Sequence, residues 1–71
     1  MKAGRLKEAI SHFEEALRLR PEYGNAHYGL GVALAKEDRL PEAISQYEAA
    51  LRIQYDPELQ QLVLRLRAAG Q

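Results

Sequence analysis

Apolar residues recur at every third or fourth position along most of the chain. Between residues 5 and 20 they form a single stripe, which is typical of one face of an amphipathic helix. The stripe consists of Leu6, Ala9, Ile10, Phe13, Ala16 and Leu17. Because Pro21 lacks the N–H group that would continue a helix, the pattern predicts a helix over 5–20 that ends just before it.

Residues 25–36 are apolar on nearly all sides, so we expect a helix that is buried against more than one neighbour. Asn25 is the predicted N-cap, because its side chain can accept a hydrogen bond from a free N–H in the first turn. Gly29 and Gly31 each cost a helix interior about 1 kcal/mol relative to alanine. Two such residues indicate that neighbouring helices approach this one closely.

Two more helices are predicted towards the C-terminus, over residues 40–54 and 57–69. Asp56 is the expected N-cap of the last one, Pro57 suits its first turn, and Gly70 is a natural end. Together the four helices predict an all-α fold in which successive helices run antiparallel.

A stretch of the sequence is repeated with an offset of 34 positions. When residues 5–22 are aligned with residues 39–56, ten of the 18 pairs are identical. Three further pairs are conservative, namely Phe13/Tyr47, Leu19/Ile53 and Glu22/Asp56. A fixed period of this length indicates a solenoid, in which each unit buries its apolar face against its neighbours. Such a fold favours a binding surface over a catalytic pocket.

The repeated pattern resembles the tetratricopeptide repeat, a unit of about 34 residues made of two antiparallel helices called A and B. The helix A motif of that family reads His27-x2-Leu30-Gly31-x2-Leu34 in this chain. The helix B motif occurs twice, as Ala9-x3-Phe13-x2-Ala16 followed by Pro21 and as Ala43-x3-Tyr47-x2-Ala50. The resemblance implies an α-solenoid of about two repeats.

The resemblance also divides the single domain of residues 1–71 into three parts. Residues 4–23 correspond to a helix B without a preceding helix A, and residues 24–56 correspond to a complete repeat. Residues 57–71 correspond to a helix A or to a capping helix. This last part departs from the family pattern, because Tyr55 stands where proline is expected and Pro57 comes two residues late.

The stripes and the family motifs together predict which side chains fill the core. We expect these to be largely buried: Leu6, Ala9, Ile10, Phe13, Ala16, Leu30, Leu34, Ala43, Tyr47, Ala50 and Leu62. Gly31 is expected where the helices approach too closely for a large side chain.

The composition excludes several classes of function. Ten basic and ten acidic side chains leave no net charge, which argues against nonspecific binding of nucleic acid or of anionic membranes. The same neutrality argues against the related pentatricopeptide repeats, which are usually long basic arrays that read RNA. There is no cysteine for a disulfide and no apolar run that could span a membrane. The N-terminus has no apolar signal core, so a cytoplasmic location is expected.

Candidate catalytic groups are few. His12 falls on the polar outer face of the first predicted helix, and His27 occupies the position of a core aromatic residue. No phosphate-binding glycine loop, paired carboxylate motif or nucleophile motif is present. We therefore predict a noncatalytic protein with no catalytic, cofactor or metal site.

Tetratricopeptide domains bind peptides on the concave face lined by their A helices, and the resemblance assigns five residues of this chain to that face. They are Asn25, Tyr28, Gly29, Val32 and Lys36. Family members that grip a terminal carboxylate use Lys and Asn where this chain has Tyr28 and Val32, so such a clamp is not expected. The main prediction is a scaffold or adaptor module whose partner is a peptide, a helix or another protein subunit.

Two alternatives remain open. The unequal ends, a helix B without its A and a helix A without its B, predict a structural unit that forms a homo-oligomer. That contact would involve Ala9, Phe13 and Ala16 at one end, and Leu62 and Leu66 at the other. The second alternative is a piece of a longer repeat array.

Overall fold

The computed structural model describes residues 3–70, which form four α-helices. These are α1 (Ala3–Leu19), α2 (Gly24–Lys36), α3 (Leu40–Ile53) and α4 (Pro57–Ala69). The predicted helices agree with these bounds to within two residues at every end. The prediction of an all-α fold is therefore confirmed.

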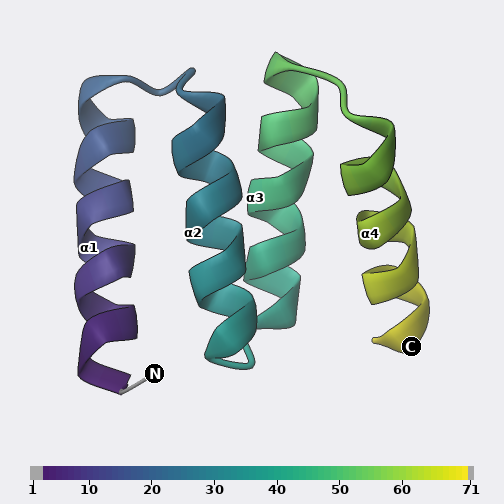
Figure 1. Cartoon of the computed structure of the whole chain (residues 1–71), viewed down its shortest axis with the longest axis horizontal. Coiled ribbons are helices and arrows are strands. Elements are labelled where there is room, and N and C mark those ends of the chain that lie inside the picture. Colours follow the sequence, from purple (N-terminus) through teal and green to yellow (C-terminus); the bar gives the residue numbers. More distant parts are fainter. Residues whose placement is uncertain (1–2, 71) are drawn as a thin grey trace.

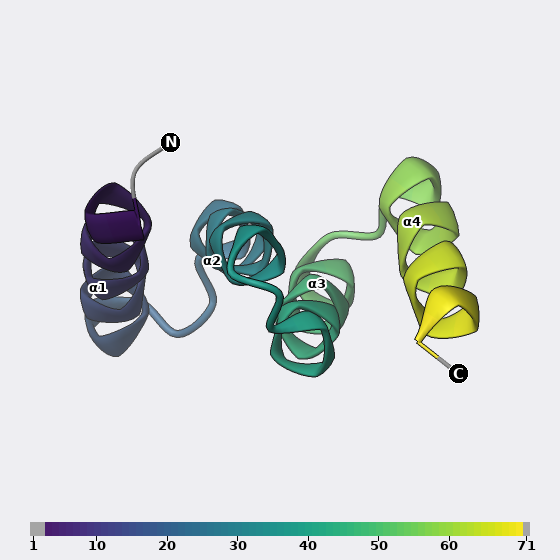
Figure 2. The ribbon, with the colours of Figure 1, turned by 90° about the horizontal axis from the view of Figure 1, so that it is seen from below.

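Figure 1 shows the four helices side by side in chain order, each antiparallel to the next. Seen from below in Figure 2, they follow a zigzag in which α2 and α4 lie on one side of the layer and α3 lies on the other. Within residues 3–70 each helix packs only against its neighbours in sequence, most extensively at α2–α3 and least at α3–α4. This is the arrangement of a solenoid, in which apolar surface is buried only between adjacent units.

All four helices contribute to one continuous apolar core. Its buried members are Leu6, Ile10, Leu30, Ala33, Leu34, Ala43, Tyr47, Ala50, Leu59 and Val63. Four predicted core residues, Ala9, Phe13, Ala16 and Leu62, are only half-buried, so the prediction was wrong for them. They lie on α1 and α4, and within residues 3–70 each of these helices has a single neighbour to cover it.

The starts of α2 and α4 differ in how they are capped. α2 begins at Gly24, one residue earlier than predicted, so Asn25 is not its N-cap. Tyr23 holds that position without a side-chain hydrogen bond. The prediction for α4 is confirmed, because Asp56 Oδ1 accepts a hydrogen bond from the backbone N–H of Glu58 at 3.0 Å.

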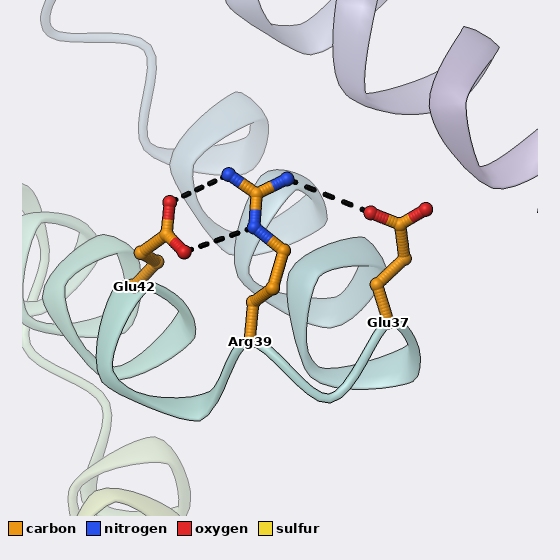
Figure 3. A network of polar contacts seen from close by, with 3 residues as sticks. All are labelled: Glu37, Arg39 and Glu42. Carbon is orange, nitrogen blue, oxygen red and sulfur yellow. Dashed lines mark hydrogen bonds and ion pairs between the residues drawn. The ribbon is translucent and has the colours of Figure 1, made fainter.

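The turn between α2 and α3 is held by an arginine that lies between two glutamates (Figure 3). Arg39 donates from Nε and Nη2 to the carboxylate of Glu42 at 2.9 and 2.6 Å, and its Nη1 lies 3.5 Å from Glu37 Oε1. The hydrogen bonds from Arg39 lower the pKa of the Glu42 carboxyl below its ordinary value. Asp38 adopts a left-handed φ of 62° in this turn, which aspartate tolerates better than most residues. Arg39 thereby ties the end of α2 to the first turn of α3.

Candidate partner-binding groove

Two glycines let α2 lie close to both of its neighbours. A Cβ on Gly31 would lie 2.7 Å from Tyr47 Cε1 and 3.2 Å from the carbonyl oxygen of Ala43, so α3 packs directly on this position. A Cβ on Gly29 would meet the ring of Phe13, which projects from α1. The two aromatic residues occupy equivalent places one repeat apart. They hold α2 from opposite sides, because two positions along a helix correspond to a rotation of about 200°.

His27 fixes the beginning of α2. Its Nε2 atom lies 2.8 Å from the carbonyl oxygen of Pro21, and its Nδ1 atom lies 2.7 Å from Oε1 of Gln46 in α3. Because a carbonyl oxygen can only accept, Nε2 donates in the first of these bonds. The amide oxygen of Gln46 also only accepts, so the second contact is a hydrogen bond when Nδ1 donates or when the Gln46 amide is turned to present its NH2 group. The imidazole ring therefore ties the α1–α2 connection to α3 and sets the position of the first turns of α2.

A groove of about 600 Å³ lies where the first turns of α2 and α4 flank the end of α3. Both of these turns, and the connections that lead into them, lie at the same end of the molecule (Figure 1). Its lining residues come from α2 and the connection before it (Tyr23, Asn25 and Tyr28), from the end of α3 (Ala50 and Ile53), and from the α3–α4 connection and the start of α4 (Tyr55, Asp56, Pro57 and Leu59). The groove is thus built from three helices and two connections.

The groove gathers exposed apolar surface. Six large hydrophobic side chains of the described chain are exposed, and four of them line this groove. These four are Tyr23, Tyr28, Ile53 and Tyr55, which are between 41% and 65% exposed. Single exposed hydrophobic residues are ordinary on protein surfaces, whereas a contiguous cluster marks an interaction site.

Charged groups are scarce in the groove. Asp56 is the one charged residue among those that line it, and its carboxylate already accepts the hydrogen bond that caps α4. The ring of Tyr28 packs against the ring of Tyr47, with centroids 5.7 Å apart and planes tilted by 45°. Burial, and to a lesser extent the neighbouring Tyr28, raises the pKa of the Tyr47 hydroxyl, so this contact is uncharged at neutral pH.

The family model described as tetratricopeptide repeat matches residues 1–57, which is most of the chain and includes α1, α2 and α3. The chain belongs to the tetratricopeptide repeat family. No curated protein and no solved structure matches it. The family motifs assign helix A to α2 and helix B to both α1 and α3, while α4 lies outside the match after its first residue, Pro57.

Two of the five residues predicted for partner binding in this tetratricopeptide domain, Asn25 and Tyr28, line the groove. Gly29 does not, because α1 covers the side of the helix from which a Cβ would project. Val32 is half-buried against the core, and Lys36 is exposed at the opposite end of α2. The groove therefore uses only the N-terminal part of the predicted stripe.

Sequence reasoning missed the rest of the groove. Ile53 was assigned to a helix without a role, and Tyr55 was noted only as a departure from the family pattern. Tyr55 is 65% exposed, so it contributes little to the core. Tyr55 could have been predicted as a binding residue, because it is an aromatic residue in a short connection where the family has proline. No core position requires a ring there.

The residues predicted for self-association lie on the two outermost helices. Ala9, Phe13 and Ala16 on α1 are half-buried, as are Leu62 and Leu66 on α4. Phe13, Leu62 and Leu66 pack against the core with part of their surface. The structure brings the two groups to opposite ends of the row of helices (Figure 1).

The last helix differs from α2 at one of two equivalent positions. Leu62 and Leu66 follow Tyr28 and Val32 by one period of 34 residues, and both leucines pack against the core. Val32 and Leu66 are alike, because both are half-buried. Leu62, in contrast, is half-buried where Tyr28 is exposed.

The described residues do not form a metal site, a buried polar site or a membrane-spanning helix. Within residues 3–70 no set of three or more His, Cys, Asp or Glu side chains is placed to hold a metal ion. No polar or charged side chain is buried in that range. Nor does any helix of the described chain combine the length and the apolar character needed to cross a membrane. What the groove offers is apolar contact with a few hydrogen-bonding groups.

Proposed function

We propose that this chain is a noncatalytic protein-interaction module, and that the groove between α2 and α4 binds a segment of a partner protein. Tetratricopeptide repeats are generally protein–protein interaction modules, and the family match supports this class of function. The observation that carries the location is the clustering of Tyr23, Tyr28, Ile53 and Tyr55 in one groove. Exposed aromatic rings of this kind supply binding energy at many interfaces.

The groove favours a partner segment that is apolar and either uncharged or basic. Tyr28 on α2 and Tyr55 in the α3–α4 connection both line the groove and offer aromatic surface to an apolar or proline side chain. Asn25 is exposed beside them, and its amide can donate to or accept from a peptide backbone. An acidic segment would meet Asp56 and no cation among the lining residues, so it would lose hydration without gaining a partner.

We also propose that α4 caps the repeat. One period after Gly31 the chain has Arg65, which is exposed, and Leu64 beside it is 49% exposed. A further helix could not approach these long side chains as closely as α3 approaches Gly31. A capping role is also consistent with the packing of the apolar side of α4 against α3.

Homo-oligomer formation through the two ends stays a prediction. Leu62 and Leu66 already have part of their surface in the core, and half of the exposed residues of α4 are polar or charged, such as Gln61 and Arg65. Light scattering over a range of concentrations would test it. A monomer at every concentration would contradict the homo-oligomer and favour the adaptor function.

Selection of a random peptide library on the immobilised chain tests the proposed groove. The selected peptides should bind Tyr28→Asp at least about tenfold more weakly, because a charge replaces an exposed ring in the groove. Ser45→Asp is the matched control, since Ser45 is exposed on α3 and does not line the groove. Circular dichroism must show the same helix content for both variants. Peptides that bind Tyr28→Asp as tightly as the unchanged chain would contradict the proposal.

A further inference from the structure

The groove between α2 and α4 presents open apolar surface and does not enclose a single side chain. Most of its lining residues are exposed, and the buried ones among them are Ala50 and Leu59. The four large apolar side chains that line it are each at least 41% exposed, namely Tyr23, Tyr28, Ile53 and Tyr55. Such a surface favours a ligand that lies across several side chains over one that inserts a single anchor.

The three tyrosines of the groove do not form one aromatic cluster. Within residues 3–70 the aromatic rings in contact are those of Tyr28 and Tyr47, so the rings of Tyr23, Tyr28 and Tyr55 do not stack on one another. A compact cation such as a methylated ammonium group needs several rings around a single point. Separate rings favour an extended ligand that packs on one ring after another.

The fold limits the backbone conformation of a bound peptide. The described residues form four α-helices and no β-strand, so they offer no sheet edge to which a peptide could add as a further strand. One turn of an α-helix with its side chains is about 10–12 Å across and 5.4 Å long, which corresponds to roughly 500 Å³. The groove of about 600 Å³ therefore holds little more than one helical turn, and a bound helix would place few side chains in it.

The charges of the groove limit the side chains of the peptide. Phosphorylated and acidic segments are bound by clusters of arginine or lysine, and neither residue is among those that line this groove. Asp56 is the one charged lining residue, and its Oδ1 accepts the N–H of Glu58 at 3.0 Å. The surface thus matches an extended segment without acidic side chains.

We propose that the partner segment bound in this groove is rich in proline and adopts the polyproline II conformation. This inference rests on the proposed function of the groove and specifies the partner. Aromatic-lined grooves are the surfaces on which proline-rich segments dock. The polyproline II conformation is already formed in the free peptide, so little conformational entropy is lost on binding. A low entropic cost is needed here, because an open surface makes fewer contacts than an enclosed pocket.

The geometry of polyproline II predicts the spacing of the prolines. This conformation has three residues per turn, so residues i and i+3 lie on the same side of the segment. Two prolines with this spacing would face the groove together, and each can pack on a tyrosine ring. The backbone carbonyl groups of the segment make no internal hydrogen bonds. The exposed side-chain amides of Asn25 and Gln54 can donate to them.

Sequencing of peptides selected from a random library on the immobilised chain is the first test, because such a library does not presuppose proline. Most of the selected peptides should contain two prolines at positions i and i+3, far more often than the unselected library does. Replacing either proline by alanine should weaken binding about tenfold, as measured by fluorescence anisotropy. Replacing a residue between the two prolines by alanine is the control, and it should change binding much less.

Two outcomes of this test separate the present inference from the proposed function. Selected peptides that lack prolines, and that bind Tyr28→Asp more weakly than the unchanged chain, would overturn the inference and support the groove. Selected peptides that bind Tyr28→Asp as tightly as the unchanged chain would contradict the groove itself.

Variants of Tyr55 distinguish packing on a ring from general apolar contact. Tyr55→Leu keeps an apolar side chain but removes the ring, so it should weaken binding of a selected proline-rich peptide about tenfold. Tyr55→Phe keeps the ring and should weaken binding by at most about threefold. Tyr55 is 65% exposed, so neither replacement disturbs the core. Ser45→Leu is the control for an added leucine, because Ser45 is exposed on α3 and does not line the groove. Equal binding by Tyr55→Leu and Tyr55→Phe would overturn the proposal.

Discussion

The ring of Tyr47 lies directly against Gly31, and this contact sets the separation of α2 and α3. A Cβ at Gly31 would be 2.7 Å from the ring and 3.2 Å from the backbone carbonyl oxygen of Ala43. Tyr47 is 3% exposed, so its ring is enclosed by neighbouring residues. The close packing offsets the cost of about 1 kcal/mol that a glycine imposes on a helix.

Replacing Gly31 by alanine should therefore destabilise the fold. The added methyl group forces a buried ring and a backbone carbonyl to shift, and overpacking of this kind costs about 1–3 kcal/mol. The higher helix propensity of alanine offsets about 1 kcal/mol of this cost, so the net loss is up to about 2 kcal/mol. Urea unfolding followed by circular dichroism measures the change.

Gly29→Ala is the matched control for that experiment. Its methyl group also meets an aromatic ring, that of Phe13, but this ring is half-buried and can turn outwards. Alanine also favours the helix by about 1 kcal/mol. We expect a net change close to zero, and equal losses at the two glycines would contradict this prediction.

Tyr47 should also make the fold sensitive to alkali. Burial, with a smaller contribution from Tyr28, raises the pKa of its hydroxyl above the ordinary value of 10.0. The unfolded chain then releases this proton more easily, so the contribution to stability is complete below about pH 10 and is lost as the pH rises through the higher pKa of the folded state.

Tyr47→Phe should remove this part of the alkaline loss. Stability near pH 7 should change by less than about 1 kcal/mol, because phenylalanine fills nearly the same space and is the residue of the first repeat. Urea unfolding of both chains at about pH 8 and about pH 11 makes the comparison. An unchanged alkaline loss in the variant would exclude Tyr47 as the cause.

Asp56→Ala should loosen α4. The variant loses the hydrogen bond from the N–H of Glu58 to Asp56 Oδ1, and loss of an N-cap costs about 1 kcal/mol. Hydrogen exchange of the α4 amides should become faster, while exchange in α2 should change less. Asp56→Asn is the control, because asparagine caps a helix about as well as aspartate. Slow exchange retained in Asp56→Ala would show that the cap does not hold α4.

A double-mutant cycle on His27 and Gln46 should reveal coupling between α2 and α3. Their side chains are 2.7 Å apart, and a hydrogen bond of this kind contributes about 0.5–1.5 kcal/mol. His27→Ala alone should cost more than Gln46→Ala, because it also removes the bond to the carbonyl of Pro21. Additive losses in the double variant would mean that the two side chains do not interact in solution.

The local pattern of the sequence was sufficient to predict the helices. Their bounds depend on residues near their ends, such as Pro21, Asp56 and Pro57, which act through the backbone of the adjacent turn. The close approach at Gly31 was also predicted, because a glycine inside an apolar helix weakens that helix unless a neighbour packs on it.

The burial of a side chain and the formation of the groove depend on which helix packs against each residue. A local sequence pattern does not contain this information. Ala9 and Ala43 are the same residue in nearly the same sequence, yet the first is half-buried and the second is fully buried. The difference arises because α3 has a helix on each side. In the same way, Tyr28 forms a groove with Tyr55 only because the direction of α4 brings the α3–α4 connection beside α2.

The central claim is that a partner segment binds between α2 and α4, and mapping of backbone amide signals in the 15N-labelled chain tests it most directly. Titration with a library-selected peptide should move the signals of residues 23–28 and 53–59 most, because these segments contain nearly all of the lining residues. The signals of α1 and of the second half of α2 should move little. The largest changes on α1, or on the exposed side of α3 around Ser45, would contradict the account.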